Sequence, residues 1–305
     1  MHNYIYGLLD LSFVQYAILF IVSFMVSMMS ITLYLHRDQA HRSIDLHPVL
    51  RHLFRFWIWV NSGAITGEWV AVHRKHHAMC ERIGDPHSPQ VFGIAKVLLE
   101  GAELYQAEAA RPETVEKYSK GTPNDWIERN VYKRVQNGGI ILLIVASLLL
   151  LGAPGIIYIG VQLISMPLFA AGIINGLGHY WGYRNFECND ASTNLTPIAF
   201  VIGGEELHNN HHAFPTSAKF SVRPHEFDIG WMYICVLRAL GLCKVRRTAP
   251  QPAIAQGRQV DIETLQAVLV NRMHVLREYT SRVTLPEFRR ERLADRSNAL
   301  LARAR

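Results

Sequence analysis

The chain has 305 residues, of which 50% are apolar and 18% charged, and this composition excludes a disordered chain, a collagen-like chain and a small disulfide scaffold. The mean hydropathy of +0.08 hides strong patterning, because residues 11–35 and 138–178 carry no charge at all. The last 25 residues carry seven arginines against three acids and so supply +4 of the net charge of +6. Basic residues concentrated in this tail and beside the apolar runs indicate that the chain binds a membrane surface rather than a nucleic acid.

The uncharged run 11–35 predicts a membrane-spanning helix, because 25 residues can cross a hydrocarbon core of roughly 30 Å with some tilt. Residues 53–72 are apolar but contain two charges and an internal Ser-Gly-Ala break, which indicates an interfacial or re-entrant helix. Residues 138–152 and 156–178 predict a hairpin of two spans around a Gly-Ala-Pro-Gly turn.

Basic residues flank the ends of these segments on one side only, and the positive-inside rule places that side in the cytoplasm. We therefore predict an all-α integral membrane protein with few transmembrane helices, three or four spans or re-entrant segments, beneath a cytoplasmic helical cap. The membrane domain with its cap is expected over residues 1–247. Residues 248–305 are expected to form a cytoplasmic extension, with an amphipathic helix over 260–280 and a basic tail.

The four cysteines form no C-x-x-C pair, so they predict neither a disulfide framework nor a thiolate metal site. The amino terminus has no basic stretch before its first apolar run, and a cleaved signal peptide is not expected.

Histidine is the unusual residue of this sequence, with 15 copies against 12 tyrosines. Nine of them gather in four motifs: His36-Arg-Asp-Gln-Ala-His41, His73-Arg-Lys-His76-His77, Asn175-Gly-Leu-Gly-His179 and His208-Asn-Asn-His211-His212. The H-x-x-H-H spacing places its rings at i, i+3 and i+4 on one helix face. The three histidine boxes are expected at the cytoplasmic ends of apolar segments, and the Asn175–His179 motif at the end of the second helix of the hairpin. Nine neutral imidazoles can complete the shells of two metal ions, and imidazole suits iron, zinc, copper and nickel.

Two details of this pattern stay open. His36 and His41 are one and a half α-helical turns apart, so they can reach different points of the same space if the helix frays there. His87, in the sequence Asp85-Pro86-His87-Ser88, is predicted to belong to a structural turn, with contact to a substrate or an electron donor as the alternative.

The ordered boxes HRDQAH, HRKHH and HNNHH, with NGLGH and the GDPHSP turn, resemble the membrane-bound fatty acid desaturases of the stearoyl-CoA Δ9 type. Within that family the sequence looks most like the bacterial Δ9 desaturases that act on acyl chains of membrane phospholipids. The resemblance runs from about residue 10 to residue 247 and implies a non-haem di-iron centre. By motif, one iron would take His36, His73, His77 and His211, with Asn175 through water. The other would take His41, His76, His179, His208 and His212.

Acidic residues near the boxes are candidates for holding a ligand imidazole in one tautomer. We expect Glu205 or Glu206, just before the third box, to do so, and Asp38 to do the same in the first box. The alternative for these acids is an ordinary salt bridge to Arg74 or Lys75.

The resemblance implies an O2-dependent enzyme that removes two hydrogens from adjacent methylenes and leaves a cis double bond, expected at Δ9, in a phospholipid-bound or CoA-bound chain. The sequence contains no haem motif and no dinucleotide fingerprint, so the two electrons are expected from a separate ferredoxin, rubredoxin or cytochrome b5 with its NAD(P)H reductase. A bacterial inner membrane is the expected location. The acyl tunnel is expected near four tryptophans that alternatively serve as interfacial anchors: Trp57, Trp59, Trp69 and Trp181.

Two rival functions remain at this point. A related di-iron membrane enzyme would hydroxylate or decarboxylate fatty acids or alkanes, and box spacing does not separate these outcomes. A protein of another class would be a non-catalytic zinc-binding membrane protein, against which the predicted spans contain no ionisable relay.

Overall fold

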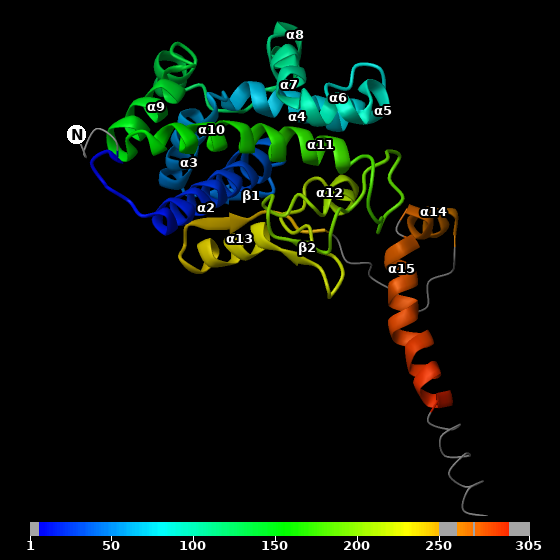
Figure 1. Ribbon diagram of the computed structural model, residues 1–305. Helices are drawn as coiled ribbons and strands as arrows, with labels where there is room; N and C mark the ends of the chain where they lie inside the picture. The colour runs from blue at the N-terminus through cyan, green and yellow to red at the C-terminus, as the bar shows by residue number, and fades with distance from the viewer. Residues whose placement is uncertain (1–5, 250–260, 271, 293–305) are drawn as a thin grey trace, which may run out of the picture. The chain divides into compact units, whose positions relative to one another are not determined.

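A computed structural model describes residues 6–249, 261–270 and 272–292 (Figure 1). The chain divides into two compact units: the described residues of Met1–Arg184 and Cys188–Ala249, and those of Asn185–Glu187 and Pro250–Arg305. The described chain is mostly helical, as predicted, and the strands found in it form two small two-stranded sheets.

The first apolar run begins at a capping box, in which the Ser12 hydroxyl and the Gln15 side chain satisfy each other's backbone amides. Segment 53–72, predicted as an interfacial or re-entrant helix with an internal Ser-Gly-Ala break, consists of two helices that are separated at this break. They part at Gly63, whose φ of 64° is the left-handed conformation of a helix C-cap. The elements of this region are α2 (Phe13–Ser30), the π-helical η1 (Ile31–Ala40), α3 (Pro48–Ser62) and α4 (Thr66–Met79).

The predicted apolar hairpin is present and turns where the sequence indicated, with Gly152 at the end of one helix and Pro154 in the first turn of the next. It consists of α9 (Gly138–Leu151), α10 (Pro154–Pro167), the π-helical η3 (Leu168–Ile173) and α11 (Ile174–Leu177). Two continuous helices, Phe13–Ala40 and Pro154–Leu177, are long and apolar enough to cross a membrane.

Residues near the start of the chain contact the turn of the apolar hairpin. The Tyr16 hydroxyl donates to the Leu151 carbonyl at 3.0 Å, and the Leu8 amide donates to the Leu149 carbonyl at 3.1 Å. The start of α2 is therefore fixed to the turn of the hairpin, whereas the histidine boxes follow the opposite ends of α2 and α10.

Short helices form the segment between α4 and the hairpin: α5 (Pro89–Phe92), α6 (Ile94–Leu99), α7 (Gly101–Ala109), α8 (Pro112–Tyr118) and η2 (Glu128–Tyr132). The junction of α6 and α7 packs directly on η3. A Cβ on Gly101 would lie 3.1 Å from the Ala171 carbonyl carbon, and one on Gly172 would lie 2.6 Å from the Leu98 oxygen. Backbone meets backbone here, so the position of α7 is fixed.

Segments distant in sequence join around the third box. Strand β1 (Ile44–Leu46) pairs antiparallel with β4 (Cys243–Val245), and β2 (Ile198–Ala199) pairs in parallel with β3 (Phe227–Asp228). The buried Arg37 side chain pairs with Asp228 at 2.9 Å and lies over the Phe220 ring. This links the first box to the segment after the third. The remaining helices of this unit are α12 (His208–Ala213) and α13 (Ile229–Ala239).

The second unit contains α14 (Ile262–Val270), α15 (Arg272–Tyr279) and the π-helical η4 (Thr280–Thr284). The predicted helix over 260–280 is thus present as two helices. The last part of the basic tail, 293–305, lies outside the described residues.

Candidate metal centre

The histidines of the first box are aligned by a π-helix rather than by fraying. Residues 31–40 form η1, and the His41 amide donates to the His36 carbonyl at 3.0 Å, five residues back. An i→i+5 turn holds more residues than an α-turn, so two side chains five apart lie nearly one above the other. Their ring centroids are 4.7 Å apart. The two rings therefore meet without any fraying of the helix.

The nine predicted histidines form two groups whose candidate ligand atoms lie within 4.8 Å of one another. We call them the first and second clusters. The first cluster consists of His36, His41, His73, His77 and His211. The second cluster consists of His76, His179, His208 and His212. The structure corrects one assignment implied by the resemblance. His41 belongs with the first cluster, since its Nε2 lies 2.7 Å from that of His73 and the π-turn directs it to the side of His36.

Four of these rings contact carboxylates through Nδ1. The pairs are His36 with Glu205 at 2.6 Å, His76 with Asp85 at 3.0 Å, His179 with Glu81 at 3.1 Å and His212 with Asp190 at 3.1 Å. A carboxylate accepts a hydrogen bond, so each of these Nδ1 atoms carries the proton and each Nε2 presents its lone pair.

That arrangement tests whether the residues suit a metal ion. His76 Nε2 and His179 Nε2 lie 3.1 Å apart, yet both rings have their proton on Nδ1. Two lone pairs at this distance cannot share a hydrogen bond, but they can both face one cation. The Nε2 of His212 is buried with no hydrogen-bond partner among the described residues. The donor set therefore fits a metal.

The buried surroundings keep these imidazoles neutral. Burial is the main cause that lowers the pKa of His41, His73 and His77 well below the ordinary value, with neighbouring histidines adding to it. The same causes lower the pKa of His208 and His212. A neutral ring is the form that binds metal, so no proton need be displaced at neutral pH.

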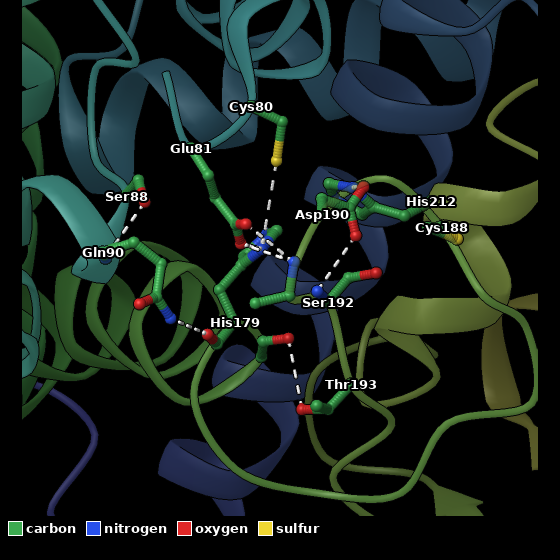
Figure 2. A network of polar contacts seen from close by, with 12 residues as sticks. Cys80, Glu81, Ser88, Gln90, His179, Cys188, Asp190, Ser192, Thr193 and His212 are labelled. Carbon is green, nitrogen blue, oxygen red and sulfur yellow. Dashed lines mark hydrogen bonds and ion pairs between the residues drawn. The ribbon is translucent and has the colours of Figure 1, made fainter. Parts of the chain in front are cut away.

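The acidic residues around the second cluster also accept hydrogen bonds from the backbone amides of two loops (Figure 2). Glu81, which has a φ of 60°, contacts His179 and accepts from the Ala191 amide at 2.8 Å. The Gln90 side chain donates to the His179 carbonyl at 3.1 Å. Asp85 accepts from the amides of Glu81 and His87 at 2.7 and 3.0 Å. The loop after α4 is thereby fixed to the ligands.

Of the three predicted carboxylate partners, only Glu205 contacts a clustered histidine. The carboxylate of Glu206 accepts instead from the amides of Val201 and Ile202, at 2.7 and 2.9 Å. Asp38 accepts from Arg51 at 2.8 and 2.9 Å and from the Leu46 amide at 3.1 Å. Of the two glutamates, either of which was expected to contact a ligand imidazole, it is thus Glu205 that does so, whereas the same interpretation of Asp38 was wrong. Asp38 does make a salt bridge, but to Arg51 instead of Arg74 or Lys75.

Sequence reasoning missed Glu81, Asp85 and Asp190. Asp85 lies in the GDPHSP turn, nine residues after His76. An acidic residue so soon after a histidine box was the signal in the sequence that could have revealed it as a histidine partner. Cys80 was also missed: its Sγ lies 3.8 Å from His76 Nε2 and 4.0 Å from His179 Nδ1. Burial, then the charge of Asp190, raises the pKa of Cys80. Its Sγ nevertheless belongs to candidate ligand groups of the described residues, for example with His76 and Asp85, so the absence of a thiolate metal site stays a prediction.

A cavity of about 180 Å³ lies against both clusters, with a wall that includes His36, His73 and His208. Asn175 and His87 also line it, and the ring centroids of His87 and His76 are 4.4 Å apart. His87, predicted to be part of a turn, thus faces the candidate substrate space. Most of the remaining wall is apolar.

Only one of the four candidate tunnel tryptophans, Trp69, lines this cavity. Trp57 donates to the Ser27 hydroxyl at 2.9 Å, and Trp59 packs against Tyr132. The side chain of Trp181 is 66% exposed. The cavity was expected near all four positions, with interfacial anchoring as the alternative. Of the four side chains only that of Trp69 reaches the wall, although Ile58, between Trp57 and Trp59, lines it.

Two clusters of neutral imidazoles beside an apolar cavity fit metal binding next to a space for an apolar ligand. The sequence model of the family described as fatty acid desaturase matches residues 12–227. The chain therefore belongs to the fatty acid desaturase family, and it is an oxidoreductase of that family.

Curated relatives cover most of the same region. An sn-1 stearoyl-lipid 9-desaturase of Synechocystis sp. is 32% identical over 230 residues, which are 74% of this chain and 69% of the relative. An acyl-CoA C20 Δ5-desaturase of Anemone leveillei is 30% identical over 216 residues, 69% of this chain and 67% of the relative. A protein named probable lipid desaturase, chloroplastic, of Arabidopsis thaliana is 32% identical over 219 residues. That match covers 70% of this chain but only 58% of the relative.

Proposed function

We propose that this desaturase introduces a cis double bond at position 9 of a saturated acyl chain esterified in a membrane lipid. It would use two iron ions, O2 and two electrons from a separate redox protein. The Synechocystis relative carries a name of this kind, whereas the Anemone relative is named for a CoA substrate and position 5.

The observation that carries the proposal is that one cavity wall includes residues of both clusters, His36 and His73 from the first and His208 from the second. An apolar chain in this cavity passes directly beside the ligands. When bound, the two irons supply the activation of O2. The nine histidines of the clusters and Asn175 would hold them, and the remaining wall residues position the chain and exclude water.

The lining residues of the cavity differ in exposure, and from this difference we infer a closed end and an open end. Met28, Ile58 and Met166 line it and are 2%, 2% and 4% exposed, whereas Gln106 lines it and is exposed. Met28 precedes His36 by eight residues, a helical length of roughly 12 Å. A chain inserted to the closed end therefore lies with its methyl-terminal part beyond the metals, and its middle methylenes lie beside them.

Exposed apolar faces support a membrane location. Phe13 on α2, Leu149 on α9 and Ile157 on α10 are 86%, 61% and 71% exposed. Several such side chains on the two long apolar helices are costly in water and favourable in lipid. The histidine boxes lie at those ends of the apolar helices that are flanked by basic residues. The metal centre would therefore face the cytoplasm, at a bacterial inner membrane.

The charges near the open end favour a lipid ester over CoA. Residues 94–118 present four exposed acids and three exposed bases: Glu100, Glu103, Glu113 and Glu116 against Lys96, Arg111 and Lys117. A CoA group carries several phosphates and needs a surplus of cations. Acids in the majority do not supply one.

The electron donor would be a ferredoxin, a rubredoxin or a cytochrome b5-type protein with its NAD(P)H reductase, on the cytoplasmic side. No nucleic-acid partner is proposed. Residues 1–247 would suffice for the desaturase domain, and 248–305 would form a separate cytoplasmic extension.

The test is expression of the full chain in a bacterial host that cannot make unsaturated fatty acids. The expected product is a monounsaturated chain with its double bond at position 9, found on phospholipid before it appears in the thioester pool during a pulse of labelled stearate. Hydroxylated chains or terminal alkenes would identify the rival di-iron reactions. A purified chain that holds zinc and consumes no O2 would overturn catalysis altogether.

A further inference from the structure

Tyr105 presents a polar group that the cavity does not satisfy. Its side chain lines the cavity, and its hydroxyl oxygen is buried without a hydrogen-bond partner among the described residues. Leaving a buried hydroxyl unpaired is costly, so a ligand that accepts a hydrogen bond there gains binding energy.

The helix that carries Tyr105 is positioned rigidly. Ala102, Tyr105 and Gln106 line the cavity and are spaced i, i+3 and i+4, so they share one face of α7. Gly101 at the start of this helix abuts the backbone of Ala171 in η3, as described above. The hydroxyl of Tyr105 is therefore held at a fixed place in the wall.

That place is beside the open end of the cavity. Gln106, the next residue, lines the cavity and is exposed, whereas the closed end is formed by buried apolar side chains such as Met28 and Met166. An acyl chain enters this space with its methyl end first, because the closed end offers only apolar contacts. The polar linkage of the chain then remains at the wall formed by α7.

The surroundings keep the hydroxyl a donor. Burial is the main cause that raises the pKa of Tyr105, and the carboxylate of Glu68 adds to it. The hydroxyl therefore retains its proton at any physiological pH. An acyl carbonyl has lone pairs and no proton, so it is complementary to this group.

We propose that the Tyr105 hydroxyl donates a hydrogen bond to the acyl carbonyl oxygen of the substrate and thereby sets which methylenes lie beside the metals. This role rests on the proposed function, since it presumes an acyl chain in the cavity. A polar contact at one fixed point gives an otherwise apolar cavity a register that single methylenes define poorly.

A binding experiment removes the carbonyl and the hydroxyl in turn. The purified full chain is titrated with 1-stearoyl-lysophosphatidylcholine and with its 1-octadecyl ether analogue, which lacks the carbonyl. The wild type should bind the ester roughly tenfold more tightly, and Tyr105→Phe should bind both equally, as expected for one buried hydrogen bond. Tyr118→Phe on α8, outside the cavity wall, is the matched control and should keep the preference. An ester preference that survives in Tyr105→Phe would overturn the assignment.

The product gives a second readout. In the bacterial host, Tyr105→Phe should retain wild-type iron content but spread the double bond over neighbouring positions, whereas Tyr118→Phe should leave one position. A single unshifted position in Tyr105→Phe would refute the register role. If the wild type itself makes no monounsaturated lipid, the proposed function fails, and the titration still decides whether Tyr105 binds a carbonyl.

Discussion

The two histidine clusters differ in what surrounds them. The first has five histidines and one contacting carboxylate, Glu205, and it presents two of its rings to the cavity. The second has four histidines, three of which contact carboxylates, and only His208 lines the cavity. Similar imidazole sets are thus supported by different environments. The first faces the substrate space, whereas the second is enclosed by charged loops.

Charge strengthens this contrast. The first cluster has a single carboxylate contact, Glu205, which also accepts from the Thr32 hydroxyl at 3.2 Å. At the second cluster, burial opposes ionisation of Asp85, but hydrogen bonding to His76 lowers its pKa to about 2, and it is fully ionised at neutral pH. Ionised carboxylates behind the ligands offset the charge of a cation, so we expect the second cluster to hold its ion more tightly.

The largest effect is expected when a ligand of either cluster is removed. His211→Ala in the first cluster and His76→Ala in the second should each abolish desaturation, because both ions are needed for the reaction, while membrane insertion persists. Lipid analysis of the host and iron per purified chain measure this. His225→Ala, an exposed histidine outside both clusters, is the control. Retained activity in either ligand variant would contradict the assignment.

A smaller effect should separate the clusters. Asp85→Asn and Asp190→Asn should each weaken iron retention at the second cluster by about 10- to 100-fold, because the partner that fixes the ring and its tautomer is lost. Glu205→Gln should affect only the first cluster. Iron remaining against a competing chelator, with Mössbauer spectra to distinguish the two sites, measures the difference. Loss of the same site in all three variants would show that the clusters are not independently supported.

The smallest effect on the metals is expected at Asp38, which lies in the first box but contacts Arg51. Asp38→Asn should leave iron content unchanged and destabilise the fold by about 1–3 kcal/mol, because a buried charge-assisted contact is broken. Thermal unfolding and iron analysis are the measurements. Iron loss comparable with that of Glu205→Gln would mean that Asp38 supports a ligand after all.

Much of the centre could be predicted from sequence because its ligands lie close together along the chain. H-x-x-H-H on a helix dictates which rings share a face, so the participation of His73, His76 and His77 follows from local geometry. The division between the clusters did not follow, because the position of His41 depends on a π-turn that no residue pattern announces. Contacts at long range were equally inaccessible. The hydrogen bond that His36 donates to Glu205 joins residues 169 positions apart.

The fold shows the same limit. Uncharged runs and the Gly-Ala-Pro-Gly turn predicted the apolar helices and their hairpin, since hydrophobicity and helix breaking are local properties. The wall of the cavity was not predictable, because Tyr105 and Met28 belong to helices whose relative position is decided by tertiary packing. The tryptophans near the boxes did not identify the wall, since only Trp69 among them lines the cavity.

The π-turn of η1 constrains how this sequence can vary over evolution. It brings His36 and His41 together because the number of residues between them is matched to a wider helical turn. Substitutions among the intervening four residues leave that number unchanged. A single insertion or deletion there would rotate one histidine away from the cluster. The first box is therefore expected to conserve its length more strictly than its composition. The four residues between its histidines can be replaced by others, but their number cannot change.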